Sequence, residues 1–123
     1  MEKIAKRYLG APYLWGGRSP FGIDCSGFIQ VVYRFFGQHL PRDAYQQAKL
    51  GDLIQLVAEA RTGDLAFFAN DKGKIIHVGI VLPEGKIIHA HGEVRIDPLD
   101  NYGIHNADLK RYSHNLICIK RML

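Results

Sequence analysis

Cys25, His77 and His89 are residues of the types that together perform nucleophilic catalysis. A cysteine nucleophile needs a histidine base within hydrogen-bond reach, and that base needs a third polar group to hold its ring. Cys25 begins the apolar-periodic segment 25–36, whereas His77 and His89 lie in two β-type runs of a predicted hairpin. His91 shares the face of His89, so both are candidates for the third group. Because a helix N-terminus stabilises a thiolate, the position of Cys25 also predicts a lowered pKa.

Two plainer interpretations of these residues stay open at this point. A free cysteine is commonly just a small buried hydrophobic side chain. His89 and His91, together with His77 and a carboxylate, are also a workable set of zinc ligands. However, no HExxH or CxxC spacing accompanies them, and a zinc site leaves the placement of Cys25 unexplained. The residues therefore favour a cysteine nucleophile that uses no metal and no other cofactor.

Helical patterns dominate the first half of the chain. Apolar spacing predicts helices over 2–9 and 25–36, and a capping-box pattern predicts a third over 43–50. Residues 52–62 are expected to form a further short helical segment and a linker. The 25–36 helix carries Cys25 in its first turn, on the apolar stripe that packs against the rest of the fold.

Two further features flank the predicted cysteine helix. Residues 13–22 combine aromatic residues with Gly and Pro, which indicates an irregular, tightly turned loop. Tyr13 and Trp15 either pack beneath this loop or line a cleft beside the thiol. Asp43 and Gln46 are the capping-box pair, so an N-cap role alone explains an aspartate at position 43.

β-type runs make up most of the second half of the chain. The predicted strands cover 65–69, 74–82, 86–90 and 116–120, and turn sequences separate the first three. Residues 97–115 are polar and are expected to form a long surface connection. Helices followed by strands indicate an α+β domain, with the cysteine helix packed on an antiparallel sheet.

Length and composition favour a single globular domain over residues 1–123. The chain is 47% hydrophobic and 23% charged, which is ordinary for a folded protein. Its net charge of +4 comes from scattered Lys and Arg residues, so an anionic partner fits but nucleic acid is not indicated. Only two cysteines are present, and Cys118 lies in an apolar alternation that indicates a core position.

Neither a membrane span nor a signal peptide is predicted. No apolar run reaches the length of about eighteen residues that a spanning helix needs. The N-terminus enters a helical pattern without the apolar segment of a secretory signal. The expected location is therefore the cytoplasm, or the cell envelope and secreted space if a leader has been removed.

Six segments of the chain, taken in order, resemble the NlpC/P60 peptidases. The segments are 13–17, 24–28, 40–42, 63–68, 77–80 and 88–90. This resemblance implies a papain-like α+β fold and hydrolysis of the peptide stems of bacterial cell wall, at the bond from γ-D-glutamate to a diamino acid. By motif position it implies that Cys25 is the nucleophile, His77 the base and His89 the polar third member. It also implies that Tyr13 supports the oxyanion site.

The chain is similar in further detail to the dipeptidyl-peptidase VI-like subset of that family. This subset acts on stems with a free N-terminal L-alanine, and carboxylates face the ammonium group of the substrate. By motif position these carboxylates are Asp24 and Asp43, with Trp15 and Ser26 as further substrate contacts. Ala44 replaces the usual serine, which removes one polar contact. The SH3-like domains common upstream in the subset would lie in a longer parent chain.

Two other classes of function stay open beside this hypothesis. An acyltransferase or lipid amidase on a related papain-like scaffold needs a long apolar groove, and the sequence shows no excess of apolar residues to line one. A non-catalytic wall-binding module is expected to lack one of Cys25, His77 and His89, yet all three are present. The favoured hypothesis is a cysteine peptidase that acts on muropeptides or peptidoglycan stem peptides.

Overall fold

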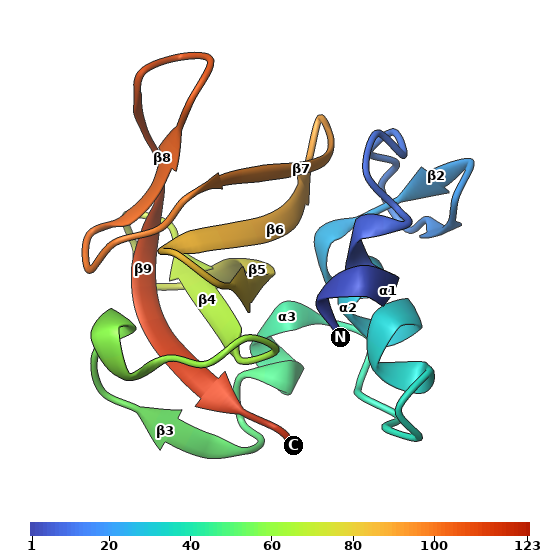
Figure 1. Ribbon diagram of the computed structural model, residues 1–123, viewed down its shortest axis with the longest axis horizontal. Helices are drawn as coiled ribbons and strands as arrows, with labels where there is room; N and C mark the ends of the chain where they lie inside the picture. Colours follow the sequence, from blue (N-terminus) through green and yellow to red (C-terminus); the bar gives the residue numbers. More distant parts are fainter.

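The computed structural model describes residues 1–123 as a curved antiparallel sheet with helices beside it (Figure 1). The helices are α1 (Glu2–Lys6), α2 (Cys25–Arg34) and α3 (Ala44–Gln47), and a single 3-10 turn covers Val57–Glu59. The main sheet contains β3 (Asp52–Ile54), β4 (Leu65–Ala69), β5 (Ile75–Leu82), β6 (Lys86–His91), β7 (Glu93–Pro98), β8 (Gly103–Asn106) and β9 (Arg111–Arg121). A separate ribbon is formed by β1 (Arg18–Ser19) and β2 (Gly22–Ile23).

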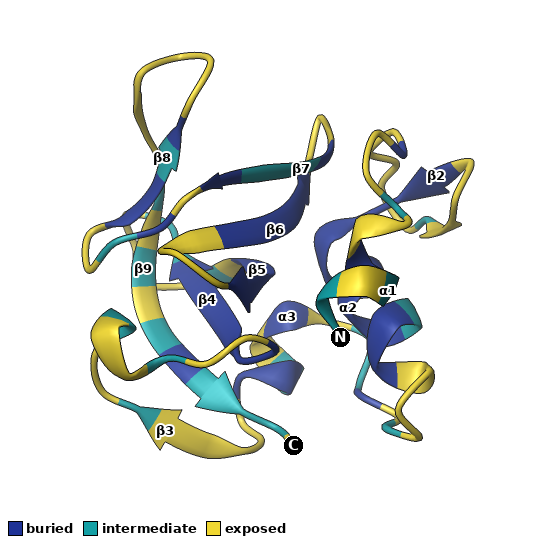
Figure 2. Cartoon of the chain, in the orientation of Figure 1, coloured by how far each residue is buried: buried dark blue, intermediate teal, exposed yellow.

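The main sheet has the strand order β3-β9-β4-β5-β6-β7, and β8 pairs with β9 outside this order. Helix α2 packs against β5 and β6 through a buried face that contains Phe28, Ile29 and Val32. Figure 2 shows buried residues concentrated on α2 and on the central strands. The Tyr33 hydroxyl donates a hydrogen bond to the Gly63 carbonyl and so ties α2 to the start of β4. A smaller core, which contains Phe68 and Ile87, lies on the opposite face of the sheet.

The predicted α+β class, with the cysteine helix on an antiparallel sheet, is confirmed. The helices are shorter than the ranges predicted for them from the sequence. Helix α2 ends at Arg34 rather than at 36, because Phe35 and Phe36 are exposed and the chain reverses at Gly37 with a φ of 76°. Helix α1 ends at Lys6 and α3 at Gln47, before the predicted ends at residues 9 and 50. None of the helices has the length and apolar character needed to cross a membrane.

Two predicted connections are wrong, because they contain strands. Residues 52–62 were expected to form a short helical segment and a linker. The 3-10 turn at Val57–Glu59 agrees with the helical segment, but Asp52–Ile54 is a strand that pairs with the C-terminal part of β9. Residues 97–115 contain the end of β7, all of β8 and the start of β9. β3 is specified by a partner distant in sequence, so the local residue pattern did not reveal it. β7 and β8 instead form hairpins with the neighbouring strands β6 and β9, in a region whose polar residues had indicated a loop. By contrast, the hairpins β4-β5 and β5-β6 lie within one residue of their predicted bounds.

Candidate active site

Cys25 is the first residue of α2, and local contacts explain why the helix begins there. The Asp24 carboxylate accepts a hydrogen bond of 2.7 Å from the Gly27 N–H, which is the usual contact of an N-cap. A Cβ atom at Gly27 would lie 2.5 Å from the Gly17 carbonyl oxygen, so this glycine lets the preceding loop pack on the first helical turn. The 24–28 motif therefore builds the helix start that presents the thiol.

Cys25 is 8% exposed, and its thiol lies beside β5. Its Sγ is 3.9 Å from the carbonyl oxygen of Ile76, the residue that precedes His77. No hydrogen bond joins the Cys25 thiol to the His77 ring. A nucleophile and its base are often not hydrogen-bonded until the transition state forms, so this geometry is compatible with that pair of roles.

A cleft of about 570 Å³ borders Cys25. Its walls are the aromatic loop, the starts of α2 and α3, and the first residues of β5. Six of the eight residues that sequence analysis singled out line this cleft: Tyr13, Trp15, Asp24, Cys25, Ser26 and Asp43. Trp15 is 85% exposed, so it borders the cleft rather than packing beneath its loop.

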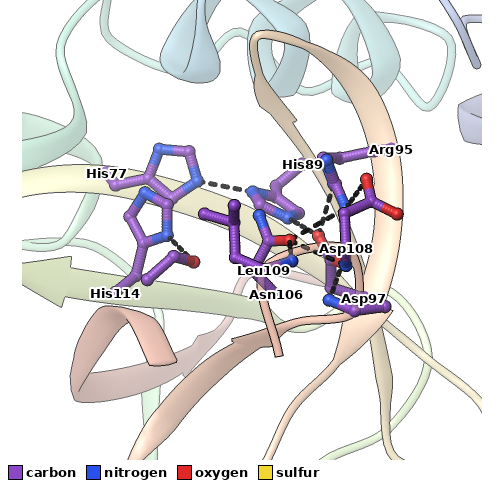
Figure 3. Close-up of polar contacts among 10 residues, drawn as sticks. His77, His89, Arg95, Asp97, Asn106, Asp108, Leu109 and His114 are labelled. Carbon is purple, nitrogen blue, oxygen red and sulfur yellow. Dashed lines mark hydrogen bonds and ion pairs between the residues drawn. The ribbon is translucent and has the colours of Figure 1, made fainter. Parts of the chain in front are cut away.

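His77 on β5 and His89 on β6 contact each other, and His77 directly follows Ile76, which lines the cleft (Figure 3). Because His89 pairs with Gly79 across the two strands, His77 and His89 share one face of the sheet. His77 Nε2 lies 2.9 Å from His89 Nδ1, and both rings are buried. A Cβ atom at Gly79 would lie 3.0 Å from the His89 Cβ, so a glycine is needed for this close approach.

Asp97 on β7 extends this pair and was missed by sequence analysis. His89 Nε2 lies 2.8 Å from Asp97 Oδ2, and Asp97 is 1% exposed (Figure 3). The Arg95 guanidinium contacts both oxygens of the same carboxylate, at 2.8 Å and 3.0 Å. The sequence did contain a usable signal, because residues 93–97 alternate directly after Gly92, which is typical of the second strand of a hairpin.

Two other histidines lie near the pair. His91 is exposed and forms no hydrogen bond to His77, so His89 is the one that contacts the predicted base. His114 on β9 stacks on His77, with ring centroids 4.1 Å apart and an interplanar angle of 25°. No local pattern pointed to His114, since its position follows from the placement of β9 in the sheet.

His77, His89 and His114 each offer one ring nitrogen, and these three atoms lie within 4.8 Å of one another. The arrangement suits a hydrogen-bonded chain better than a metal site. The facing nitrogens of His77 and His89 already share a hydrogen bond. A metal lies close to the plane of each ligating ring, and the nearly parallel planes of His77 and His114 do not meet at a common point between the rings.

Burial dominates the electrostatics of these groups. It raises the pKa of the Cys25 thiol, and Asp24 raises it further, despite thiolate-stabilising N–H groups of Val78 and Ser26. The predicted lowering of this pKa is therefore not found, because desolvation outweighs the helix N-terminus. Burial and the neighbouring histidines lower the pKa of His77 well below 6.5, and burial also lowers that of His89. Thiol and imidazole are accordingly both neutral at rest.

Arg42 occupies the part of the cleft next to Asp24 and was also missed as a site residue. Its guanidinium contacts both oxygens of Asp24, at 3.0 Å and 2.6 Å, and donates a hydrogen bond of 2.9 Å to Ser26 Oγ. Asp24 thus already has a cationic partner. Asp43, by contrast, is exposed and forms no ion pair, and its backbone N–H donates to Gln46 Oε1 at 3.2 Å within the predicted capping box.

Comparisons with known proteins agree with this geometry. A family model described as the NlpC/P60 family matches residues 10–112. A gamma-D-glutamyl-L-lysine dipeptidyl-peptidase of Bacillus subtilis is 48% identical over 85 residues, which are 68% of this chain and 28% of that protein. The chain thus spans less than a third of that relative. An NlpC/P60 family protein from Bacillus cereus has a TM-score of 0.81 at 34% identity, covering 97% of this chain and 38% of the other.

A further solved structure shows that this fold also serves a different purpose. RipD from Mycobacterium tuberculosis is described as a non-catalytic NlpC/p60 domain protein adapted to a peptidoglycan-binding function. It has a TM-score of 0.77 at 25% identity, covering 99% of this chain and 94% of that one. The fold alone therefore does not distinguish a catalytic protein from a binding protein, and the distinction must be made from the residues of the site.

Proposed function

The chain belongs to the NlpC/P60 family, and from this premise we propose that it is a cysteine peptidase of bacterial cell-wall stem peptides. The bond that it cleaves is the one from γ-D-glutamate to the diamino acid. The observation that carries the proposal is a cleft bordered by Cys25, whose Sγ lies beside the strand that carries His77, the hydrogen-bonded partner of His89. The name of the 48% identical Bacillus subtilis relative supports the choice of bond.

His77 acts as the general base in the first step. Its Nε2 is engaged with His89, which leaves Nδ1 to take the proton of the Cys25 thiol. Sγ then forms a bond to the carbonyl carbon of the scissile amide, and the electron pair of the C=O bond moves to oxygen. Because both groups are neutral at rest, the proton moves as the sulfur attacks rather than before it.

The oxyanion is stabilised at the start of α2. The Cys25 N–H is free of an intrahelical partner there, and Tyr13 on the cleft wall supplies a hydroxyl. Burial and the charges of Cys25 and Asp24 raise the pKa of Tyr13, so its hydroxyl stays protonated and can donate. The electron pair on the oxyanion then re-forms the carbonyl, the C–N bond breaks and the leaving amine takes the proton from His77. The product is a thioester on Sγ, which water hydrolyses to release the acid and restore the thiol. No cofactor enters any step.

Asp43 is the carboxylate that best suits a substrate ammonium group. It lines the cleft, is exposed and forms no ion pair, whereas Asp24 is already bound to Arg42. We therefore propose that Asp43 faces the free N-terminus of the stem peptide, with Trp15 beside it. Asp24 acts by holding Arg42 and, through it, Ser26 in place.

The test is incubation with L-Ala-γ-D-Glu-diaminopimelate and its N-acylated counterpart, with products identified by mass. We expect release of diaminopimelate, faster from the free-amine peptide. Cys25→Ser should abolish cleavage, whereas the matched Cys118→Ser variant should retain it. A chelator should leave the activity unchanged. Saturable binding without cleavage would instead indicate a peptidoglycan-binding module, and loss of activity on chelation would contradict the metal-free mechanism.

A further inference from the structure

We propose that Asp97 is a positioning residue that sets the tautomers of His89 and His77 in series, so that Nδ1 of His77 carries no proton. The inference rests on the proposed function, because it concerns the base of the same reaction. Asp97 lies outside the cleft and reaches His77 only through His89 (Figure 3). It therefore acts without touching the substrate.

Asp97 is an acceptor with no capacity to donate. Oδ2 lies 2.8 Å from His89 Nε2 and 2.8 Å from Arg95 Nε. Oδ1 accepts from Arg95 Nη2 at 3.0 Å and from the Ala107 N–H at 3.1 Å. Burial opposes ionisation, but the hydrogen bonds from His89, Arg95 and Ala107 hold the pKa of Asp97 well below its usual range. An ionised carboxylate only accepts, so His89 Nε2 must carry the proton.

The same reasoning passes from His89 to His77. Burial keeps His89 neutral, so with its proton on Nε2 its Nδ1 bears a lone pair. That lone pair accepts the contact of 2.9 Å from His77 Nε2, which must therefore be the protonated nitrogen of the neutral His77 ring. Nδ1 of His77 is then bare, which is the form required to take a proton from Cys25.

Loss of the carboxylate would remove this constraint. His89 could then hold its proton on Nδ1, where it would donate to His77 Nε2. His77 would in turn carry its own proton on Nδ1 and could no longer act as a base. Arg95 supports Asp97 from the same face of β7 and is itself paired with the exposed Asp108 at 2.9 Å.

Asp97→Asn is the informative substitution because it replaces one of the two acceptor oxygens with an NH2 donor. If the amide nitrogen faced Arg95 Nη2 and the Ala107 N–H, it would meet two hydrogen-bond donors, which is unfavourable. If it faced His89 instead, it would meet one donor, Arg95 Nε, and could donate to His89 Nε2. The second orientation is therefore favoured, and it reverses the tautomer of His89. We expect kcat to fall by about 10- to 100-fold with KM nearly unchanged, since a wrong tautomer impairs the chemical step and not binding.

Tautomers are read directly by ¹⁵N NMR of the histidine side chains. In the wild type both His77 and His89 should be protonated on Nε2, and in Asp97→Asn both should be protonated on Nδ1. This measurement needs no substrate, so it tests the inference even if the protein cleaves no stem peptide. A wild-type His77 protonated on Nδ1 would overturn the inference, whether or not the variant folds.

A double substitution separates positioning from a merely structural effect. A His89→Asn background lacks the imidazole that links Asp97 to His77, so adding Asp97→Asn there should change kcat by less than about 2-fold. Asp108→Asn is the matched control, since it removes a carboxylate from the same guanidinium without touching Asp97, and it should retain wild-type kcat. Equal losses from Asp97→Asn in both backgrounds would contradict the relay.

Discussion

His77 is held on several sides by other side chains. His89 contacts its Nε2 at 2.9 Å, His114 stacks on one face of the ring, and the Phe68 ring lies 5.7 Å away. These contacts limit rotation of the imidazole and exclude water from it, which explains the lowered pKa. We therefore expect replacement of His77 and replacement of His89 to lower kcat by different amounts.

We predict a graded response to substitution of the histidines. His77→Ala should lower kcat by about 10³-fold or more, because it removes the base itself. His89→Asn should keep measurable turnover, since asparagine can still accept from His77 Nε2. His91→Ala should be nearly silent, because His91 is exposed and does not bond to His77. Steady-state kinetics on the tripeptide would decide this, and an inactive His91 variant beside an active His89 variant would show that the wrong partner was chosen.

The two free thiols should differ in reactivity. Burial raises the pKa of both Cys25 and Cys118, so thiolate content alone does not separate them. Only Cys25 stands at a helix start beside the strand of His77, where a base and backbone N–H groups assist attack. Iodoacetamide at neutral pH should label Cys25 at least about 10-fold faster, as followed by peptide mass mapping. Comparable labelling of the two residues would count against a catalytic Cys25.

Helix α3 is a short element whose start performs two tasks. The capping box of Asp43 and Gln46 stabilises its first turn, and the same turn forms one wall of the cleft. A helix of this length contributes little stability by itself, so its placement depends on packing of Ala44 and Ala48 against the core. The Asp43 carboxylate forms no ion pair, so its charge is available to a cationic ligand.

Asp43→Asn separates the capping role from the charge. Asparagine caps nearly as well as aspartate, so the melting temperature should change little. A charge-assisted hydrogen bond to an ammonium group is worth about 1.5–3 kcal/mol, so kcat/KM for the free-amine peptide should fall by about one to two decades. Activity on the N-acylated peptide should not fall. Retention of the free-amine preference by the variant would exclude Asp43 as the recognition residue.

The whole fold holds three histidines in their neutral form, of which His77 and His89 are buried and His114 is partly buried. Burial lowers the pKa of His77 and His89, and it lowers the pKa of His114 to about 3. In the unfolded chain these side chains titrate near about 6.5. Between the folded and unfolded pKa values the unfolded chain binds more protons, so stability is complete above about pH 6.5 and decreases as the pH falls below it.

We predict that the melting temperature is constant from about pH 8 to 7 and decreases from about pH 6.5 to 4.5. This window lies above the lowered pKa values of Asp24 and Asp97, so the histidines account for the change. Calorimetry of the wild type and of His114→Gln measures it, and the variant should show a shallower decrease because one titrating group is gone. A melting temperature independent of pH over this range would mean that the histidines are not buried as described.

Local patterns in the chain were sufficient for the parts of the fold that depend on neighbouring residues. The apolar spacing of residues 25–36 predicted a helix that starts at Cys25, because the residues of one helical face lie only three or four positions apart. The hairpins β4-β5 and β5-β6 were predicted because turn residues and side-chain alternation are also local. The placement of His77 and His89 on one face of adjacent strands follows directly from them.

Contacts between distant residues could not be derived in that way. Pairing of β3 with β9 and stacking of His114 on His77 both depend on how the sheet closes on itself. Hydrogen bonds between strands join backbone groups and depend little on the side chains, so the sequence of one strand does not identify the strand with which it pairs. The raised pKa of Cys25 has the same origin, because desolvation is set by everything that packs around the thiol and not by its position in a helix.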